Sequence, residues 1–276
     1  MKVSVISPVY NVAPYIEACI ESIKQQTFTD FEVLFIDDHS PDNSIEVARR
    51  AAEGDSRFRF LTTPHNGGPG LARNLGIEQA QGQYIAFIDS DDAWQPTFLE
   101  KLVSQADAHN ADLTYCQLQY CGGANDGKVF RNPVLEAGEF SLEKKQYFLR
   151  HFVTFSVCFL FRRSFLVENN LRFPLLRNSE DTHFLTCCLL LSERMACVDD
   201  PLYIYMIRSN SLSTGKNPNR YKQRLAAAKA LRKAYLSYCQ QPLYASLQLR
   251  RLYATIHWLL FKKGYAQAVI DLLKNL

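Results

Sequence analysis

The sequence predicts an α/β protein in which helices flank a mixed, mostly parallel β-sheet. Two observations carry this prediction. Over the first hundred residues, short apolar runs alternate with segments of helical periodicity, and strands separated by helices of this length pair in parallel with helices on both faces. Each expected strand is also followed by a turn rich in Gly, Pro, Asp or Asn, where ligands bind in such sheets. The chain of 276 residues fits one large domain or one domain with an extension.

Four strands are expected in this region as short apolar or β-branched runs, at residues 3–7, 31–36, 58–63 and 84–89. The first helix, at residues 14–26, places Ile16, Cys19, Ile20 and Ile23 on one face. Further helices are expected at residues 42–54, from the glycine-rich turn 65–70 to Gly82, and at residues 95–109. The alternation of these elements is what predicts the parallel sheet.

The pattern is less regular beyond residue 110. Strands are expected at residues 111–123 and 156–163, a helix capped by Ser179 at residues 179–193, and extended chain at residues 195–208. From Tyr221 onward the pattern is mainly helical. We therefore expect a main domain over residues 1–207 and a basic, mainly helical C-terminal extension over residues 208–276.

Charge is distributed unevenly along the chain. Residues 208–276 contain thirteen Lys and Arg and one acid, a net charge of +12, whereas the preceding 207 residues carry 18 basic and 27 acidic groups, a net charge of −9. A basic extension favours an anionic partner. It suits an anionic membrane surface, a solvated helix face or a contact between two copies of the chain. No nucleic-acid recognition motif is present, so a nucleic-acid partner is not expected.

Composition excludes several classes of protein. No apolar run reaches the roughly 18 residues of a membrane span, and the start "MKVSVISPVYN" lacks the pattern of a signal peptide. We therefore expect a cytoplasmic protein. Its eight cysteines are scattered through apolar segments without a CxxC pair. They are expected to be reduced and buried.

The stretch "YIAFIDSDDAW" carries the strongest functional signal. A buried strand runs directly into Asp89, Asp91 and Asp92. One Asp would cap the next helix, but three carboxylates in four residues repel one another unless a cation is present. Mg²⁺ and Mn²⁺ use one or two carboxylates together with phosphate oxygens and water. The stretch therefore favours a metal–phosphate site, with helix capping as the alternative.

Two further turns follow strands of the same expected sheet. In "FIDDHSPDNS", Asp38 is placed to accept a hydrogen bond from a nucleotide base or ribose, and an Asp-Ser-Pro turn is the alternative. In "HNGGPGLARNLG", the glycines permit close backbone approach and Arg73 is placed to meet phosphate charge. A solvated Arg on a helix face is the alternative there.

Taken together, four ordered segments resemble the inverting glycosyltransferases of family 2, which have the GT-A fold and use nucleotide-sugar donors. The segments are "VSVISPVYN", "QTFTDFEVLFIDDHSPDNS", "NGGPGLARNLGIEQAQGQYIAFIDSDD" and "SEDTHF". The resemblance is close over residues 2–92 and looser as far as "YIYMIRSNSLS". It implies that residues 1–207 form a GT-A catalytic domain with a mixed, Rossmann-like sheet.

The resemblance also implies a role for each matching residue. A nucleotide-binding set is expected at Pro8, Val9, Tyr10, Asp38, Asn66, Arg73 and Asp91. Within it, Pro8 and Tyr10 match positions that line a uracil pocket, and Asp38 matches the acid that reads the base edge. Asp91 and Asp92 match the element that contacts the ribose and the metal–diphosphate. Asp89 completes this acidic cluster.

The resemblance makes Asp181 the catalytic base. An inverting transfer needs one carboxylate to remove the acceptor hydroxyl proton on the face opposite the leaving diphosphate. Two acids in the first turn of a helix are the alternative reading of Glu180 and Asp181. Arg208 lies in a segment that resembles one closing over the donor, and His39 stands where related sequences have Gly.

The expected function is transfer of a sugar from a nucleotide-sugar, best fitted by a UDP-sugar, to a saccharide in cell-surface glycan synthesis. The expected cofactor is Mn²⁺ or Mg²⁺. A lipid-linked acceptor at the inner face of the cytoplasmic membrane would account for the basic extension. The alternative is a non-catalytic protein that binds sugar nucleotides and kept the fold. A nucleotidyltransferase fits less well, because "SPVYNVAPY" is not a glycine-rich phosphate loop.

Overall fold

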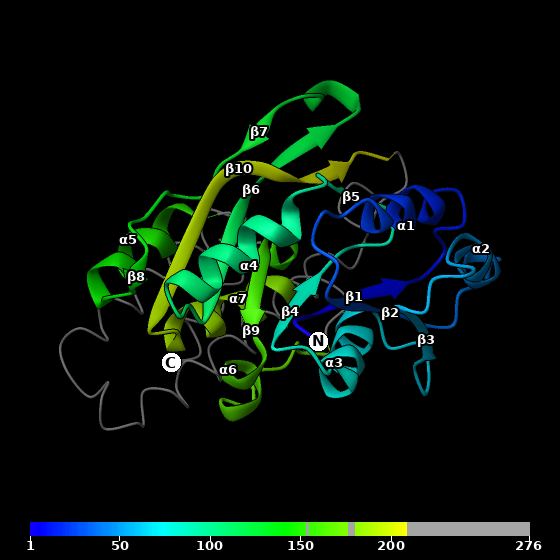
Figure 1. The fold of residues 1–276 in the computed structure, drawn as a ribbon, viewed down its shortest axis with the longest axis horizontal. Helices are drawn as coiled ribbons and strands as arrows, with labels where there is room; N and C mark the ends of the chain where they lie inside the picture. Colours follow the sequence, from blue (N-terminus) through cyan, green and yellow to red (C-terminus); the bar gives the residue numbers. More distant parts are fainter. Residues whose placement is uncertain (153–154, 176–179, 209–276) are drawn as a thin grey trace, which may run out of the picture.

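The structure is a computed structural model that describes residues 1–152, 155–175 and 180–208. The expected helical extension and the expected cap Ser179 lie outside these residues, with the exception of Arg208. Ten described strands form one sheet in the order β3-β2-β1-β4-β9-β6-β10-β5, to which β7 adds beside β6 and β8 beside β10 (Figure 1).

The strands are β1 (Val3–Val9), β2 (Phe31–Asp37), β3 (Phe58–Thr62), β4 (Tyr84–Phe87), β5 (Ala93–Trp94), β6 (Leu113–Cys121), β7 (Val129–Phe130), β8 (Gly138–Glu139), β9 (Phe159–Arg162) and β10 (Arg194–Met206). Strands β1 to β4 pair in parallel. Strand β9 runs antiparallel to both β4 and β6, whereas β6 and β10 are parallel. The expected mixed, mostly parallel sheet is confirmed.

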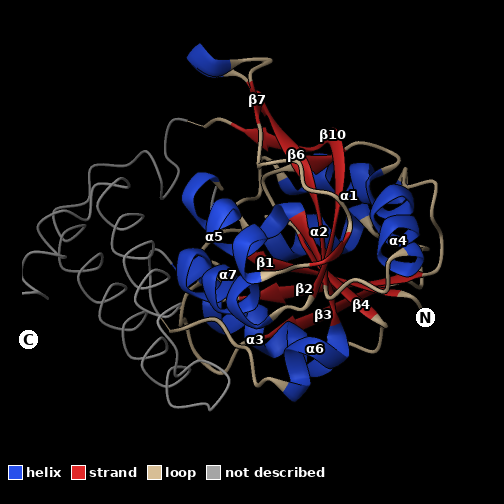
Figure 2. Cartoon of the chain, turned by 90° about the vertical axis from the view of Figure 1, so that its left-hand side faces the viewer, coloured by secondary structure: helices blue, strands red, loops and turns tan. Residues whose placement is uncertain are grey.

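The α-helices are α1 (Ile16–Lys24), α2 (Ser44–Ala51), α3 (Pro69–Gln79), α4 (Phe98–Ala108), α5 (Leu142–His151), α6 (Arg163–Glu168) and α7 (Glu180–Leu191), and the short 3₁₀ turns are η1 (Gly123–Asn125) and η2 (Ser156–Cys158). Helices cover both sides of the sheet, with α4 and α7 on opposite sides (Figure 2). No described helix is long and apolar enough to cross a membrane.

The sheet order places a switch point between β1 and β4. The chain passes from β1 through β2 to β3 on one side and then returns to add β4 on the other side of β1. Loops that follow the carboxyl ends of β1 and β4 therefore diverge around a shared space, which is where ligands bind in open α/β sheets. The turns at residues 8–11 and 89–92 both leave from this point.

A cluster of buried aromatic rings fixes helix α7 against the sheet. The ring of Phe184 stacks on Phe173 with a centroid separation of 3.8 Å and meets the edge of Phe87 at 6.0 Å. All three side chains are at most 1% exposed. Loss of such a buried Phe side chain typically costs about 3–5 kcal/mol of stability. This packing positions the first turn of α7, which carries Glu180 and Asp181.

Element boundaries differ from the expectation in two instructive places. Helix α3 ends at Gln79, before Gly82, and a Cβ at Gly82 would come within 2.5 Å of the backbone nitrogen of Ser4. Gly82 therefore allows the turn before β4 to lie close against β1. The short strand β5, directly after the acidic turn, was not expected, because the sequence suggested the start of a helix there. It pairs with β10 through Trp94 and Tyr203.

Candidate active site

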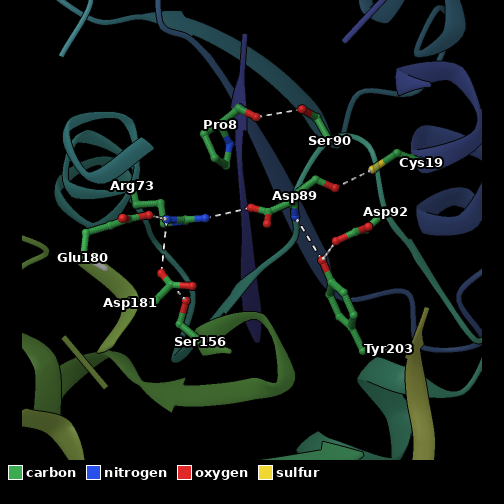
Figure 3. A network of polar contacts seen from close by, with 10 residues as sticks. All are labelled: Pro8, Cys19, Arg73, Asp89, Ser90, Asp92, Ser156, Glu180, Asp181 and Tyr203. Carbon is green, nitrogen blue, oxygen red and sulfur yellow. Dashed lines mark hydrogen bonds and ion pairs between the residues drawn. The ribbon is translucent and has the colours of Figure 1, made fainter. Parts of the chain in front are cut away.

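The turns after β1 and β4 meet at the switch point. The Ser90 hydroxyl donates a hydrogen bond to the Pro8 carbonyl at 2.8 Å, and Figure 3 shows this contact beside the acidic turn. The Pro8 side chain is half-buried and Tyr10 is exposed by 49%. Both predicted residues are thus placed at the edge where a ligand can reach them.

Val9 is the last residue of β1. Its side chain is fully buried in the core, because β1 is an inner strand of the sheet and nearly all of its residues are buried on both faces. Its backbone carbonyl accepts a hydrogen bond from the Asp38 N–H at 3.0 Å. Val9 therefore supports the strand pairing and presents no side chain to a nucleotide.

Asp38 holds the glycine-rich loop in place. Its carboxylate accepts hydrogen bonds from the Thr63 hydroxyl at 2.8 Å and from the backbone N–H groups of Gly67 and Gly68 at 3.0 and 2.7 Å. The Asn66 side chain donates to the Asp38 carbonyl at 2.9 Å. Asp38 is only 3% exposed. A carboxylate offers about four acceptor positions, so these three bonds leave little capacity for reading a base.

His39 adopts a left-handed backbone conformation with φ of 60°. This conformation favours Gly, and a non-Gly residue there is uncommon. The ring Nε2 of His39 lies 2.8 Å from the Thr63 carbonyl, which requires a donating N–H at that nitrogen. His39 and Asp38 both bind the segment after β3, so the turn after β2 and the glycine-rich loop form one unit.

Arg73 lies at the centre of a buried ion cluster that extends from α3 to β4 and α7 (Figure 3). Its Nη2 contacts Asp89 Oδ1 at 2.7 Å, and its Nη1 contacts Glu180 Oε1 at 3.1 Å and Asp181 Oδ1 at 3.3 Å. Arg73 is 3% exposed. The structure therefore brings together residues that the sequence placed in separate roles, and it engages Arg73 with carboxylates where a phosphate was expected.

Burial and charge shift the ionisation of this cluster. Burial raises the pKa of Asp181, Arg73 opposes this effect, and Asp89 adds to it. Burial, aided by the charge of Asp181, raises the pKa of Glu180 to about 7 despite the opposing charge of Arg73. Burial lowers the pKa of Arg73, but the charges of Asp181, Asp89 and Glu180 outweigh burial and raise it overall. One cation thus serves three carboxylates, and Glu180, with a pKa of about 7, is partly protonated near neutral pH.

Asp92 is the most deeply buried carboxylate of the acidic turn. Its Oδ2 accepts a hydrogen bond from the Tyr203 hydroxyl at 2.6 Å, and its Oδ1 accepts one from the Met206 N–H at 2.8 Å. The side chain is buried, at 3% exposure. Burial, with Asp89 and Asp91 adding to it, raises the pKa of Asp92 well above its usual value. Asp92 therefore attaches β10 to the acidic turn.

Asp91 carries the most suitable carboxylate for a cation. Its side chain is 15% exposed and its Oδ2 lies 2.5 Å from Arg208 Nε. Burial and the charge of Asp89 raise the pKa of Asp91 to about 6, although Arg208 opposes the shift. The Arg208 guanidinium also covers the Tyr15 ring at 5.3 Å. A carboxylate that draws a positive group this closely fits a divalent cation.

The described residues contain no group of three or more His, Cys, Asp or Glu side chains arranged to hold a metal. A cation of the Mg²⁺ or Mn²⁺ type commonly takes one or two protein carboxylates and completes its shell with phosphate oxygens and water. The single carboxylate of Asp91 fits that pattern.

Sequence reasoning missed two residues that contact the predicted site. Ser156 of η2 donates a hydrogen bond to Asp181 Oδ1 at 3.0 Å, and Tyr203 of β10 binds Asp92 and the Asp89 N–H. Tyr203 stands in an alternating strand pattern and Ser156 in a strand-like run, and neither pattern distinguishes them. Only the pairing of β10 with β5 and the packing of η2 on α7 bring them into the site.

The fold and the site define an α/β protein with an acidic turn at the switch point of its sheet. Comparison with known proteins names the family. Residues 4–168 match the model for glycosyl transferase family 2, which is more than half of the chain, and the chain belongs to that family. The predicted resemblance is confirmed.

Several relatives share this region. The uncharacterized glycosyltransferase EpsJ of Bacillus subtilis is 34% identical over 218 residues, which cover 76% of this chain and 62% of EpsJ. The uncharacterized glycosyltransferase YibD of Escherichia coli is 30% identical over 256 residues, 87% of this chain and 73% of YibD. The chain spans 62% and 64% of the length of EpsJ and of its B. subtilis counterpart EpsH.

Solved structures share the fold. Staphylococcus aureus TarS 1–349 in complex with UDP-GlcNAc superposes with a TM-score of 0.75 at 24% identity, over 91% of this chain and 69% of that one. The mannosyltransferase PcManGT of Pyrobaculum calidifontis, in complex with GDP-Man and Mn²⁺, gives a TM-score of 0.62 at 18% identity, over 99% and 79% of the two chains. The expected GT-A fold is thereby confirmed.

Proposed function

We propose that this glycosyltransferase is metal-dependent and inverting, and that it transfers a sugar from a UDP-sugar to a saccharide acceptor with Asp181 as the base. One observation carries the proposal. Arg73 joins Asp89, in the turn expected to face the donor, to Asp181 through contacts of 2.7 and 3.3 Å. The expected base is therefore held beside the expected donor site, although the two residues are far apart in sequence.

Asp181 has the features that a general base needs. Its side chain is 21% exposed, so an acceptor hydroxyl can approach it, and Arg73 favours its ionised form. As the hydroxyl oxygen attacks the anomeric carbon, the Asp181 carboxylate takes its proton. The bond from the anomeric carbon to the diphosphate breaks, with positive charge spread over the sugar ring.

Donor binding is assigned to the turns around the switch point. Pro8 and Tyr10 line the exposed edge beside β1, and Asp91 is the carboxylate that would hold Mn²⁺ or Mg²⁺. A bound divalent cation stabilises the charge that builds on a departing diphosphate. Arg208, at the end of β10, lies against Asp91 and would meet the same diphosphate. Asp92 supports this arrangement by attaching β10 to the turn.

A UDP-sugar is the donor that the likenesses favour. TarS, named a poly(ribitol-phosphate) beta-N-acetylglucosaminyltransferase, is 30% identical over 209 residues, 74% of this chain and 35% of TarS. Its structures were solved with UDP and with UDP-GlcNAc. PcManGT binds GDP-Man within the same fold. UDP-GlcNAc is therefore the first donor to test, and GDP-Man is the matched alternative.

The test is a screen of nucleotide sugars with the purified full chain. UDP release is measured with UDP-GlcNAc, UDP-glucose and UDP-galactose, and GDP release with GDP-Man, each with Mn²⁺, with Mg²⁺ and with a chelator. The proposal expects turnover of a UDP-sugar that the chelator abolishes. Turnover that persists in the presence of the chelator would refute the proposed metal dependence. Tight UDP binding without any turnover would support the non-catalytic alternative.

We also propose an acceptor and a cellular location for this protein. A saccharide hydroxyl, free or lipid-linked at the inner face of the cytoplasmic membrane, suits the basic residues 208–276. Flotation of the full chain with vesicles of anionic and of neutral lipid tests this. Binding only to anionic vesicles is expected. Equal recovery of the protein with both vesicle types would contradict membrane binding by the basic extension. It would favour the alternatives of a solvated helix face or a contact between two copies of the chain.

A further inference from the structure

Arg73 is the buried cation of the site, at 3% exposure, and the proposed chemistry gives it no substrate to contact. We propose that Arg73 is a positioning residue, which acts with Ser156 to orient the base Asp181 and keep it ionised, and that it is not a ligand of the nucleotide. This inference rests on the proposed function of Asp181. It replaces the expectation that Arg73 meets a phosphate.

The geometry at Asp181 supports a positioning role for Arg73 and Ser156. Ser156 Oγ donates to Asp181 Oδ1 at 3.0 Å, and Arg73 Nη1 approaches the same oxygen at 3.3 Å. Two donors from η2 and α3 thus fix one carboxylate oxygen from two directions. These contacts hold Oδ1 of the carboxylate, and Ser156 also donates a backbone hydrogen bond to Asp181.

The burial of Arg73 and its partners place it out of reach of a nucleotide. Its side chain is 3% exposed, its Cζ lies 5.2 Å from the centroid of the Phe173 ring, and its Nη atoms contact Asp89, Glu180 and Asp181. A phosphate would have to displace carboxylates and enter a buried space to reach it. Arginine suits this bridging role because its planar guanidinium presents donors in several directions at once.

The charges around Asp181 also support this role of Arg73. Asp181 is faced by Arg73 of α3, by Asp89 after β4, by its neighbour Glu180, and by Ser156 and Cys158 of η2. Burial and Asp89 raise the pKa of Asp181, and Arg73 opposes both. Without the Arg73 charge, the base would hold its proton to a higher pH. Arg73 therefore favours the ionised form of Asp181, which is the form that can accept a proton.

The decisive experiment measures the ionisation of Asp181 without any turnover. The full chain is labelled at the side-chain carboxyl carbons of Asp, and the Asp181 signal is identified by its absence from Asp181→Asn. Its NMR titration midpoint is compared in the wild type, Arg73→Gln and Arg73→Lys. Arg57→Gln is the matched control, because Arg57 pairs with Asp55 at 2.6 Å outside this cluster.

We expect the midpoint to rise by about one unit or more in Arg73→Gln, which is the usual size of the effect of a neighbouring opposite charge. Arg73→Lys keeps the charge and should stay near the wild-type value, and Arg57→Gln should not change it. An unchanged midpoint in Arg73→Gln overturns the proposal. If that variant does not fold, Ser156→Ala decides instead, with a smaller rise expected and no rise as the contrary result.

A second readout separates positioning from nucleotide binding. Arg73→Lys cannot hold Asp181 and Asp89 with the same fork of donors, so kcat for UDP-GlcNAc should fall about tenfold or more, a loss equal to about 1.4 kcal/mol. Its KM and its affinity for UDP should stay within about twofold of the wild type, because a group that acts only in the transition state lowers kcat alone. A tenfold weaker UDP affinity in this variant would make Arg73 a nucleotide ligand and overturn the proposal.

The two proposals fail in different ways. If the wild type turns over no nucleotide sugar, the proposed function fails, while the NMR midpoint still decides whether Arg73 controls Asp181. If the wild type is active but the midpoint does not depend on residue 73, the function stands and the role of Arg73 is refuted.

Discussion

The carboxylates of the site fall into two regions that are held by different kinds of partner. Asp89, Glu180 and Asp181 surround the cation Arg73, whereas Asp92 is held by the neutral Tyr203 hydroxyl and Met206 N–H. Burial raises the pKa of Asp92 well above its usual value, but Arg73 counteracts the same effect at Asp181. A buried carboxylate beside a cation stays available for chemistry, and one beside neutral donors serves to fix the fold.

The largest effect expected in the Arg73 region comes from the base. Asp181→Asn keeps the size of the side chain and an acceptor oxygen for Ser156, but it cannot take a proton. We expect kcat for sugar transfer to fall about 10²- to 10⁴-fold, the usual contribution of general base catalysis. Steady-state release of the nucleoside diphosphate in the presence of an acceptor measures this. Full activity of the variant would refute the role of Asp181.

The next effect concerns stability in the same region. Arg73→Gln leaves the buried Glu180 and the partly buried Asp89 and Asp181 without their cation, and removing one partner of a buried ion pair costs about 3–5 kcal/mol. The loss should be smaller at pH 5 than at pH 8, because Glu180, whose pKa is about 7, is neutral at the lower pH. Urea unfolding of the variant and the wild type at both pH values measures the difference. Equal losses at pH 5 and pH 8 would contradict this account of the cluster.

The Tyr203 region should respond to pH in a different way. The pKa of Asp92 is raised in the folded state, so its contribution to stability is complete below the unfolded pKa and is lost as pH rises through the folded pKa. Asp92→Asn removes this titration. We expect the variant to gain stability relative to the wild type between pH 5 and pH 8, as measured by urea unfolding. If the free energies of unfolding of the variant and the wild type changed in parallel with pH, ionisation of Asp92 would not destabilise the folded state.

An exposed ion pair serves as a control for the stability effects expected in both regions. Lys101 contacts Asp200 at 2.7 Å, with the two side chains 45% and 50% exposed. Exposed pairs contribute about 0–1 kcal/mol, so Lys101→Ala should change the free energy of unfolding by less than about 1 kcal/mol. A larger loss, in the range expected for Arg73→Gln, would remove the distinction between buried and exposed pairs in this protein.

The sequence predicted the first part of the fold well because that part is built from local patterns. Strands β1 to β4 are short apolar or β-branched runs, and the helices between them have clear periodicity, so their parallel pairing follows. Strand β5 was not predicted, because two residues hold no periodic pattern. Its formation depends on β10, which pairs Tyr203 with Trp94 from more than a hundred residues away.

The site was predicted in outline, and its divergences share one physical cause. The acidic turn was found by residue type, and the pair Glu180–Asp181 through the family resemblance, but the orientation of each side chain depends on distant partners. Asp92 turns inward because Tyr203 and Met206 donate to it, and Arg73 turns inward because Glu180 lies 3.1 Å away. Sequence spacing cannot distinguish Asp91, which lies near the surface, from its buried neighbour.

The central claim is that donor binding and proton removal belong to different carboxylates, Asp91 and Asp181. Calorimetric titration of UDP in Mn²⁺ into Asp181→Asn and Asp91→Asn tests it most directly. The account predicts wild-type affinity, within about twofold, for Asp181→Asn and affinity weaker by about tenfold or more, equal to about 1.4 kcal/mol, for Asp91→Asn. Loss of UDP binding in Asp181→Asn, or unchanged binding in Asp91→Asn, would contradict it.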